Sequence, residues 1–152
     1  MRRVLDGELE LDDDRERVDL AAVHAYLSGE SYWARGRPLE EQRRLNGEAA
    51  RLVGLYAKSG AQIGFTRTAY WPEQTLAFLY DVYVLEEFRG RGLGLELVRE
   101  TIEGSGFAGA LWLLRTNDMH RLYAKLGFEE PDDKWMVRPK GGDGSASAPD
   151  HP

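Results

Sequence analysis

The sequence predicts one α/β domain with a mixed central sheet of about six to seven strands and helices on both faces. The main observation is a nearly continuous apolar run at 75–85, which is typical of a strand buried on both faces. Apolar residues at helical spacing precede and follow this run, and other short strand-forming runs lie between them. A length of 152 residues with 42% hydrophobic content also suits a single domain with its own core.

The first half of the chain predicts one strand, two helices and a hairpin. Leu9 and Leu11 alternate with acidic residues, as they do in a strand with one buried face. Asp19 is a suitable N-cap for a helix, and Pro38 is well placed to begin another. The expected elements are a strand at 8–12, a helix over 19–29, a loop at 31–36, a helix from Pro38, and hairpin strands at 51–56 and 62–68.

The second half predicts strands and helices in alternation around a glycine-rich turn. Asp81 is the one charge inside the apolar strand, and Gly127 is a normal C-terminal residue for the last helix. The expected elements are a strand at 75–85, a helix over 93–102, a strand at 110–114, a helix over 119–126, and a last strand in which Phe128 and Trp135-Met136-Val137 close the sheet.

Composition excludes several classes of protein. The chain has no cysteine, which rules out disulfides, a thiolate nucleophile and cysteine zinc sites, and its 3 histidines are scattered, so we expect no metal. A net charge of −6 argues against nucleic acid as a partner. No apolar run approaches a membrane span and the N-terminus lacks the apolar core of a signal peptide, so we expect no membrane contact and a cytoplasmic protein.

The end of the chain differs from the rest. Residues 140–152 hold no apolar side chain larger than alanine, so nothing offsets the entropic cost of ordering them. We therefore expect a folded domain over 1–139 and a disordered tail over 140–152.

The most informative segment is the glycine-rich turn between the buried strand and the following helix, Arg89-Gly90-Arg91-Gly92-Leu93-Gly94. Glycines allow the backbone to approach a ligand closely, and the N–H groups at a helix N-terminus attract anions. The residues suit a pyrophosphate, although a tight turn without a ligand explains them too. The Walker loop does not fit, because no Gly-Lys-Ser/Thr follows, and the glycine spacing is wrong for a Rossmann turn.

A second segment, Leu122-Tyr123-Ala124-Lys125-Leu126-Gly127-Phe128, follows about thirty residues later. Together the two segments resemble the GNAT superfamily of N-acetyltransferases, which has an Arg/Gln-x-x-Gly-x-Gly/Ala turn and a later Leu-Tyr-x-Lys-Leu-Gly-Phe block. The order of elements matches that superfamily over residues 8–138. The Ser31-Tyr32-Trp33 segment and the strand end Asp81-Val82-Tyr83-Val84 are similar to a bacterial subgroup of it.

The resemblance implies acetyl-CoA as acyl donor and assigns roles to individual residues. Tyr123 matches the tyrosine that protonates the departing thiolate. A tyrosine hydroxyl carries its proton at neutral pH and can donate it to a thiolate. Packing beside Leu122 and Leu126 is the alternative explanation of Tyr123. Expected contacts to coenzyme A come from Val82, Tyr83, Val84, Arg89, Gly90, Arg91, Gly92, Leu93, Gly94, Leu95, Thr116 and Asn117.

The sequence departs from the superfamily at two positions. A cofactor-contacting asparagine often lies seven residues before the tyrosine, where this chain has Thr116 followed by Asn117, and either residue fits the role. A glutamate on the fifth strand is often the general base, and Leu114 stands at the nearest position here. The resemblance therefore assigns no general base.

Asp81 is the remaining candidate for a group that interacts with the acceptor amine. A charge inside an apolar strand is costly unless it is paired or has a function. One interpretation is that it attracts the amine or helps to deprotonate it through water. The other is a structural acid bonded to backbone N–H groups or to an arginine such as Arg115. Strand alternation predicts that Tyr80 faces the side opposite to Asp81.

Four aromatic residues are candidates for an acceptor pocket, Tyr32, Trp33, Tyr70 and Trp71, of which the first two are the main substrate-binding candidates. Packing of the helices onto the sheet explains them equally well. His24 and His120 are expected at the surface or in packing.

The function predicted is direct transfer of acetyl from acetyl-CoA to a primary amine, with a small molecule as acceptor. Direct transfer follows from the lack of a cysteine to carry the acetyl group. The alternatives are acetylation of a protein lysine or N-terminal amine, and a non-catalytic module that binds acyl-CoA. Homodimers are common in the superfamily, so the resemblance also implies a second copy of this chain as a candidate partner.

Overall fold

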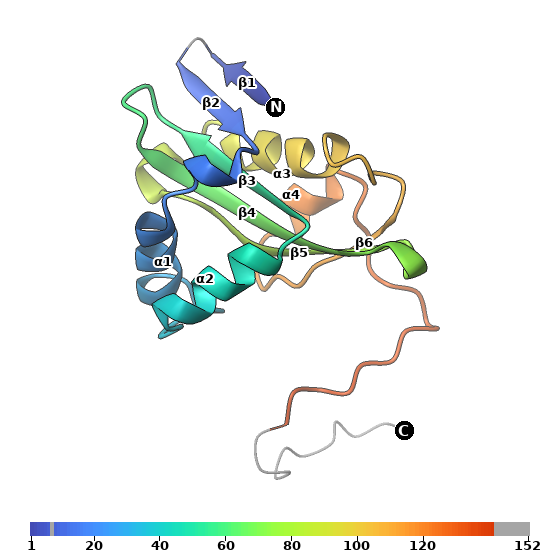
Figure 1. Cartoon of the computed structure of the whole chain (residues 1–152). Helices are drawn as coiled ribbons and strands as arrows, with labels where there is room; N and C mark the ends of the chain where they lie inside the picture. Colours follow the sequence, from blue (N-terminus) through green and yellow to red (C-terminus); the bar gives the residue numbers. More distant parts are fainter. Residues whose placement is uncertain (7, 142–152) are drawn as a thin grey trace.

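Six strands form one sheet in the order β1-β2-β3-β4-β5-β6 in a computed structural model that describes residues 1–6 and 8–141 (Figure 1). Neighbouring strands are antiparallel except β5 and β6, which are parallel. The mixed sheet predicted from the sequence is therefore confirmed. Its strands are β1 (Arg2–Leu5), β2 (Leu9–Asp12), β3 (Arg51–Tyr56), β4 (Gln62–Trp71), β5 (Leu76–Val84) and β6 (Leu111–Leu113).

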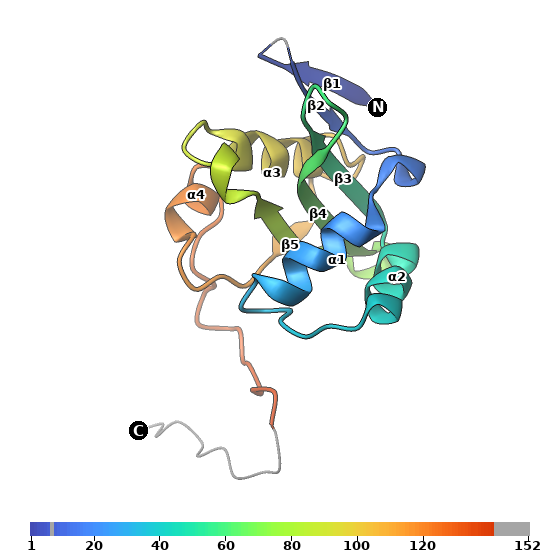
Figure 2. The ribbon, with the colours of Figure 1, turned by 90° about the vertical axis from the view of Figure 1, so that its left-hand side faces the viewer.

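Helices cover both faces of the sheet (Figure 2). Helices α1 (Leu20–Gly29) and α2 (Leu39–Glu48) lie on one face, and α3 (Leu93–Glu103) and α4 (His120–Ala124) lie on the other. Short 3₁₀ helices occur at Arg15–Arg17, Pro72–Gln74 and Glu86–Phe88. The core is split accordingly, because Leu27 and Phe65 pack together on the α1 side, while Leu55 and Leu97 pack together on the α3 side.

The local signals in the sequence correspond to real helix starts. The Asp19 carboxylate caps α1 by accepting a hydrogen bond from the backbone N–H of Ala22 at 3.0 Å. Pro38 is the N-cap of α2, and Glu40 and Glu41 lie in its first turn, where acidic side chains interact favourably with the helix dipole.

Two differences from the predicted elements concern the ends of the sheet. Strand β1, which pairs with β2, was not predicted, because its residues alternate only between exposed and half-buried positions. The prediction that Phe128 and Trp135-Met136-Val137 close the sheet is wrong. The three residues at 135–137 are exposed and outside any strand, and Phe128 packs edge-on against Tyr123.

The reason for the second difference is the polar segment Glu129–Lys134, which contains Pro131 and no apolar side chain for the sheet to bury. A turn at Asp132, whose carboxylate accepts from the N–H of Lys134 at 2.9 Å, leads the chain away. Of the predicted tail, residues 142–152 lie outside the described part of the chain, as does Gly7.

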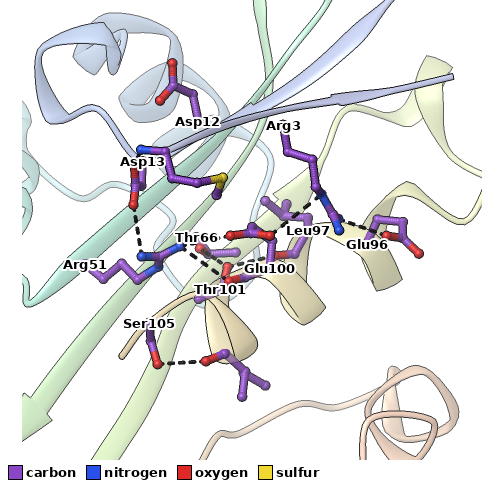
Figure 3. Close-up of polar contacts among 12 residues, drawn as sticks. Arg3, Asp12, Asp13, Arg51, Thr66, Glu96, Leu97, Glu100, Thr101 and Ser105 are labelled. Atoms are coloured by element: carbon purple, nitrogen blue, oxygen red, sulfur yellow. Dashed lines mark hydrogen bonds and ion pairs between the residues drawn. The ribbon is translucent and has the colours of Figure 1, made fainter. Parts of the chain in front are cut away.

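A buried polar network fixes α3 to the sheet and thereby sets the position of the glycine turn before it (Figure 3). Arg51 of β3 donates to Asp13 at 3.0 Å and to Glu100 of α3 at 3.3 Å. The hydroxyls of Thr66 and Thr101 lie 2.8 Å apart, and Thr101 also donates to the Leu97 carbonyl. These contacts join α3 to β3, β4 and the segment after β2.

No helix within the described residues has the length and hydropathy needed to cross a membrane.

Candidate active site

Strand β5 bulges at Asp81, close to its C-terminal end. Phe65 of β4 pairs with Tyr83, but Arg67 pairs with Tyr80, so β5 contains one residue more than β4 in this interval. Asp81 has a φ of +57°, which is unusual for a residue other than glycine. Strain of this kind persists only where the surroundings hold it, and it often marks a functional site.

Beyond the bulge the sheet is open on one side of β5. The parallel pairing with β6 ends at Phe78 and Leu113, whereas β5 continues to Val84. Within the described residues, the stretch 79–84 therefore has a strand neighbour on the β4 side alone. Its backbone groups on the other side can pair with an extended ligand, as an added strand does. Val82, Tyr83 and Val84, which the sequence predicts as donor contacts, lie in this opening.

The glycine turn lies directly after this strand end and leads into α3. Gly90 and Gly92 have φ values of +81° and +75°, which a side chain would disfavour. No side chain caps the N-terminus of α3, so its first N–H groups are available to an anion. A Cβ on Gly94 would lie 3.3 Å from Leu122, so the start of α3 packs closely on α4.

The two arginines of the turn differ in their surroundings. Arg89 donates from Nε to the Val84 carbonyl at 2.9 Å and from an Nη atom to the Tyr26 hydroxyl at 2.8 Å. It therefore ties the turn to the end of β5 and to α1. Arg91 is exposed and forms no ion pair with any residue in the described ranges, which leaves its charge available beside the turn.

Tyr123 of α4 is buried beside the opening. Its ring belongs to a cluster with Leu79 and Val98, against which Val82 also packs. Burial, with smaller contributions from Tyr32 and Asp118, raises the pKa of Tyr123 to about 12. The hydroxyl is therefore fully protonated at neutral pH and can act as a proton donor.

The loop between β6 and α4 is joined to the loop after α1. The backbone N–H of Asn117 donates to the Tyr32 hydroxyl at 3.1 Å. Thr116 accepts a hydrogen bond from the N–H of Met119 at 3.1 Å and so stabilises the turn into α4. Thr116 and Asn117, both predicted as cofactor contacts, thus lie where the two loops meet.

Asp81 lies at the centre of a buried polar cluster on the α1–α2 face, and its side chain is 1% exposed. Its carboxylate accepts from Arg67 Nε at 2.8 Å, Arg37 Nη1 at 2.9 Å and Trp33 Nε1 at 3.3 Å. Burial by itself would raise the pKa of Asp81, but Arg67 and Arg37 together lower it below its ordinary value. A buried carboxylate held in this way is a weak base.

The geometry therefore favours the structural interpretation of Asp81 over contact with the amine. Its arginine partners are Arg67 and Arg37, not Arg115. The alternation argument for Tyr80 is wrong, because the bulge intervenes: the Arg67 guanidinium contacts both Asp81 and the ring of Tyr80.

The four aromatic residues do not form one pocket. Tyr32 and Trp33 meet edge to face at 5.0 Å beside the Asp81 cluster. Tyr70 instead stacks on Phe107 at 4.0 Å, and it and Trp71 pair with the first residues of β5, away from the bulge. The prediction is thus wrong for Tyr70 and Trp71, because the sheet register places them at the other end of β5.

Sequence reasoning missed Arg67 and Arg37 as site residues. The available signal was Arg67 itself, a charge inside the predicted strand 62–68 that has the same cost as Asp81 in the next strand. Arg37 gave no such signal, because an arginine in a polar loop is unremarkable.

Two hollows on the described part of the chain lie on the α1–α2 side of the sheet. One hollow, of about 380 Å³, lies among α2, β3 and the 3₁₀ helix at 15–17, and none of the predicted site residues lines it. The second, about 250 Å³, lies between α1 and the end of β5 and includes Tyr83 and Glu30. Within residues 1–6 and 8–141, no group of three or more His, Cys, Asp or Glu side chains is arranged to hold a metal ion.

Comparison with known proteins gives a family for this fold and site. The model of the acetyltransferase (GNAT) domain matches residues 48–130, which include the bulge, the glycine turn and α4. A crystal structure from Xanthomonas campestris pv. campestris, described as a GNAT family acetyltransferase, is 30% identical, with 87% of this chain and 93% of that chain covered and a TM-score of 0.77.

More distant structures share the fold. A Deinococcus radiodurans R1 protein described as an acetyltransferase is 22% identical over 91% of this chain and 94% of its own, with a TM-score of 0.66. Glucosamine-6-phosphate N-acetyltransferase from Arabidopsis thaliana is 14% identical, with 89% of this chain and 99% of that chain covered and a TM-score of 0.61. No functionally curated protein matches the chain in sequence. The family model and the Xanthomonas structure together show that the chain belongs to the GNAT acetyltransferase family.

Proposed function

We propose that this chain transfers an acetyl group from acetyl-CoA directly to the primary amine of a small molecule. The observation that carries the proposal is the open edge of β5 at 79–84, with the uncapped N-terminus of α3 at one end and Tyr123 beside it. Such a site offers an extended thioester a strand to pair with and an anion site for its phosphates.

The residues present fit acetyl-CoA as the donor. In this proposal the backbone of Val82–Val84 pairs with the pantetheine arm. The N–H groups from Arg89 to Leu95 bind the pyrophosphate, with Arg91 adding positive charge. The fit rests on the side of β5 that has no strand neighbour, where the Val84 carbonyl accepts from Arg89, and on the two glycines of positive φ before α3. The bound donor supplies an acetyl thioester.

The chain's own groups then have two tasks. A backbone N–H of the unpaired stretch donates a hydrogen bond to the thioester carbonyl oxygen and stabilises the negative charge that develops there. Tyr123 donates its proton to the departing thiolate. The C–N bond forms as the C–S bond breaks, and the amine, which enters neutral, releases its extra proton to water. Leu114 cannot act as the base of this step.

A small acceptor is favoured over a protein chain by the loop contact across the opening. Tyr32 reaches from the loop after α1 to the N–H of Asn117, and Trp33 is held against Asp81. In this proposal, these contacts hold the loop after α1 beside the open edge of β5 and so limit the size of the acceptor. The proposal also places the reaction in the cytoplasm within a domain over residues 1–139, without nucleic acid or membrane as partner.

The test is free-thiol release from acetyl-CoA with a panel of alkyl amines, aryl amines, amino acids and lysine peptides. We expect turnover with at least one small amine. We expect no turnover that requires the acceptor to be a peptide. Calorimetry with coenzyme A is run in parallel. Binding without turnover on any acceptor supports the non-catalytic module instead, and turnover on peptides alone supports protein acetylation.

A further inference from the structure

Arg67 in the middle of β4 is a buried arginine with unused hydrogen-bonding capacity. Its residue surface is 7% exposed, and its Nε donates to Asp81 at 2.8 Å. Among the residues that the structure describes, no group accepts a hydrogen bond from its two terminal nitrogens, Nη1 and Nη2. A guanidinium of this kind can bind a further planar anion through two parallel hydrogen bonds.

The two terminal nitrogens are not fully sealed from solvent, although the Arg67 side chain as a whole is only 8% exposed. The polar side-chain atoms that are both sealed from solvent and unpaired in the described ranges belong to Arg3, Arg51, Tyr56, Thr68 and Trp112, and Arg67 is not among them. The guanidinium lies over the ring of Tyr80, 4.4 Å from its centroid, and Tyr80 stacks on Phe78. Arg67 is therefore held in one orientation, with its two terminal nitrogens unpaired among the described residues and not fully sealed from solvent.

The charge of this cluster is not balanced by the protein. Arg67 and Arg37 are both paired with the one carboxylate of Asp81, and neither arginine forms an ion pair with another acid of the described residues. Two guanidinium charges against one carboxylate leave one net positive charge in this cluster, in which Asp81 and Arg67 are buried and Arg37 is partly buried. An unbalanced buried charge is costly, and a bound monoanion removes that cost.

The location relates Arg67 to the acceptor. Arg67 pairs with Tyr80, the residue before the bulge, and lies on the face where Trp33 contacts Asp81. This is the end of the open β5 edge at which, on the proposed function, the amine meets the thioester. We propose that Arg67 binds a carboxylate of the acceptor, so that the substrate is an amino-acid-like amine. This inference rests on the proposed function.

A carboxylate fits better than a phosphate for two reasons. It carries the single negative charge that the cluster lacks, whereas a phosphate ester carries nearly two at neutral pH. Its planar pair of oxygens also matches the fork formed by Nη1 and Nη2.

The first experiment compares acceptors of the same skeleton with and without the carboxylate charge: glycine with glycinamide, β-alanine with β-alaninamide and phenylalanine with phenylalaninamide. We expect kcat/KM to be higher for the acids by about tenfold or more. At a given pH the amides have the larger fraction of neutral amine. A difference in amine reactivity alone would therefore give the amides, not the acids, the higher kcat/KM. Equal or higher values for the amides, while turnover persists, overturn the inference and leave the proposed function standing.

Phosphoethanolamine compared with ethanolamine tests the other anion. A preference for phosphoethanolamine that exceeds the acid-over-amide preference assigns the site to phosphate and overturns the assignment to carboxylate.

The second experiment uses Arg67→Lys, which keeps a positive charge beside Asp81 but loses the fork. We expect KM for the acid to rise by about tenfold more than the KM of the matched amide rises in the same variant. Arg35→Lys, on the exposed loop after α1, is the matched control and leaves both values as in the wild type. An equal change for acid and amide contradicts the inference, because a structural role of Arg67 affects both.

A third arm does not depend on turnover. The Trp33 indole N–H donates to the carboxylate that Arg67 also contacts, so its ¹H–¹⁵N resonance, assigned with Trp33→Phe, reports on the cluster. Sodium benzoate is expected to shift this resonance saturably in the wild type and not in Arg67→Lys. No saturable shift in the wild type, or the same shift in the variant, overturns the anion site even if no amine is acetylated.

Discussion

The carboxylate of Asp81 accepts a hydrogen bond from Nε of Arg67 at 2.8 Å, and the two residues face each other where β5 bulges away from β4. The contact joins the strained residue of β5 to the neighbouring strand. It explains how a residue with a φ of +57° is held in place beside the open edge.

The variant Asp81→Asn tests this structural role. Asparagine tolerates the left-handed conformation, but it leaves Arg67 and Arg37 buried without a counter-charge. We expect the free energy of unfolding to fall by about 3–5 kcal/mol, while kcat of the folded protein stays within a few-fold of the wild type. Urea unfolding measures the free energy of unfolding, and thiol release from acetyl-CoA measures kcat. The exposed Asp133→Asn is the control; unchanged stability with lost kcat would show instead that Asp81 acts on the amine.

The pH dependence of stability gives a second test of the same cluster. The pKa of Asp81 is lowered in the folded protein, so its contribution to stability is complete above the unfolded pKa of about 3.9. That contribution is lost as the pH falls below this value toward the folded pKa. Urea unfolding between pH 6 and 3 is expected to show a steeper loss of stability for the wild type than for Asp81→Asn. Parallel curves would contradict the lowered pKa.

The variant Gly92→Ala tests the turn before α3. A Cβ at Gly92 meets no atom within 4 Å, so the cost arises from its φ of +75° and not from a clash. We expect a loss of about 1 kcal/mol in stability and coenzyme A binding about tenfold weaker or more by calorimetry. Gly109→Ala, where φ is not positive and space is free, is the control. Equal affinity in all three proteins would mean that the turn does not bind the donor.

The variant Tyr32→Phe tests the loop contact across the opening. It removes the hydroxyl that accepts from the N–H of Asn117, a hydrogen bond worth about 0.5–1.5 kcal/mol. We expect KM for the acceptor to rise several-fold, with coenzyme A affinity unchanged. Tyr70→Phe, at the far end of β5, serves as the matched control and should change neither. If Tyr32→Phe leaves the acceptor KM at the wild-type value, the loop does not shape the acceptor site.

Most elements were predictable because their signals are local. The cap at Asp19, the apolar run at 75–85 and the glycine turn each determine the conformation of neighbouring residues. The same holds for the two motifs of the site, the turn and the segment around Tyr123, which lie within continuous stretches of chain.

The parts that were not predicted depend on contacts between distant residues. Asp81 lies 14 residues from Arg67 and 44 from Arg37, and no local pattern identifies which arginine pairs with it. The bulge adds one residue to β5 and so reverses the alternation that was assumed for Tyr80. Trp135 has an apolar side chain suited to a strand, but the polar segment before it provides no residues that pair with β6.

The most direct test of the central claim compares wild type and Tyr123→Phe in the transfer of acetyl from acetyl-CoA to the preferred amine between pH 6 and 10. If Tyr123 protonates the thiolate, kcat falls by roughly 100-fold or more in the variant, with coenzyme A affinity unchanged. Because the pKa of Tyr123 is raised to about 12, the wild-type rate rises as the amine deprotonates and does not fall before pH 10. A kcat of Tyr123→Phe equal to that of the wild type would contradict the account. So would a wild-type rate that begins to decrease at a pH lower than 10, if that decrease is absent in Tyr123→Phe.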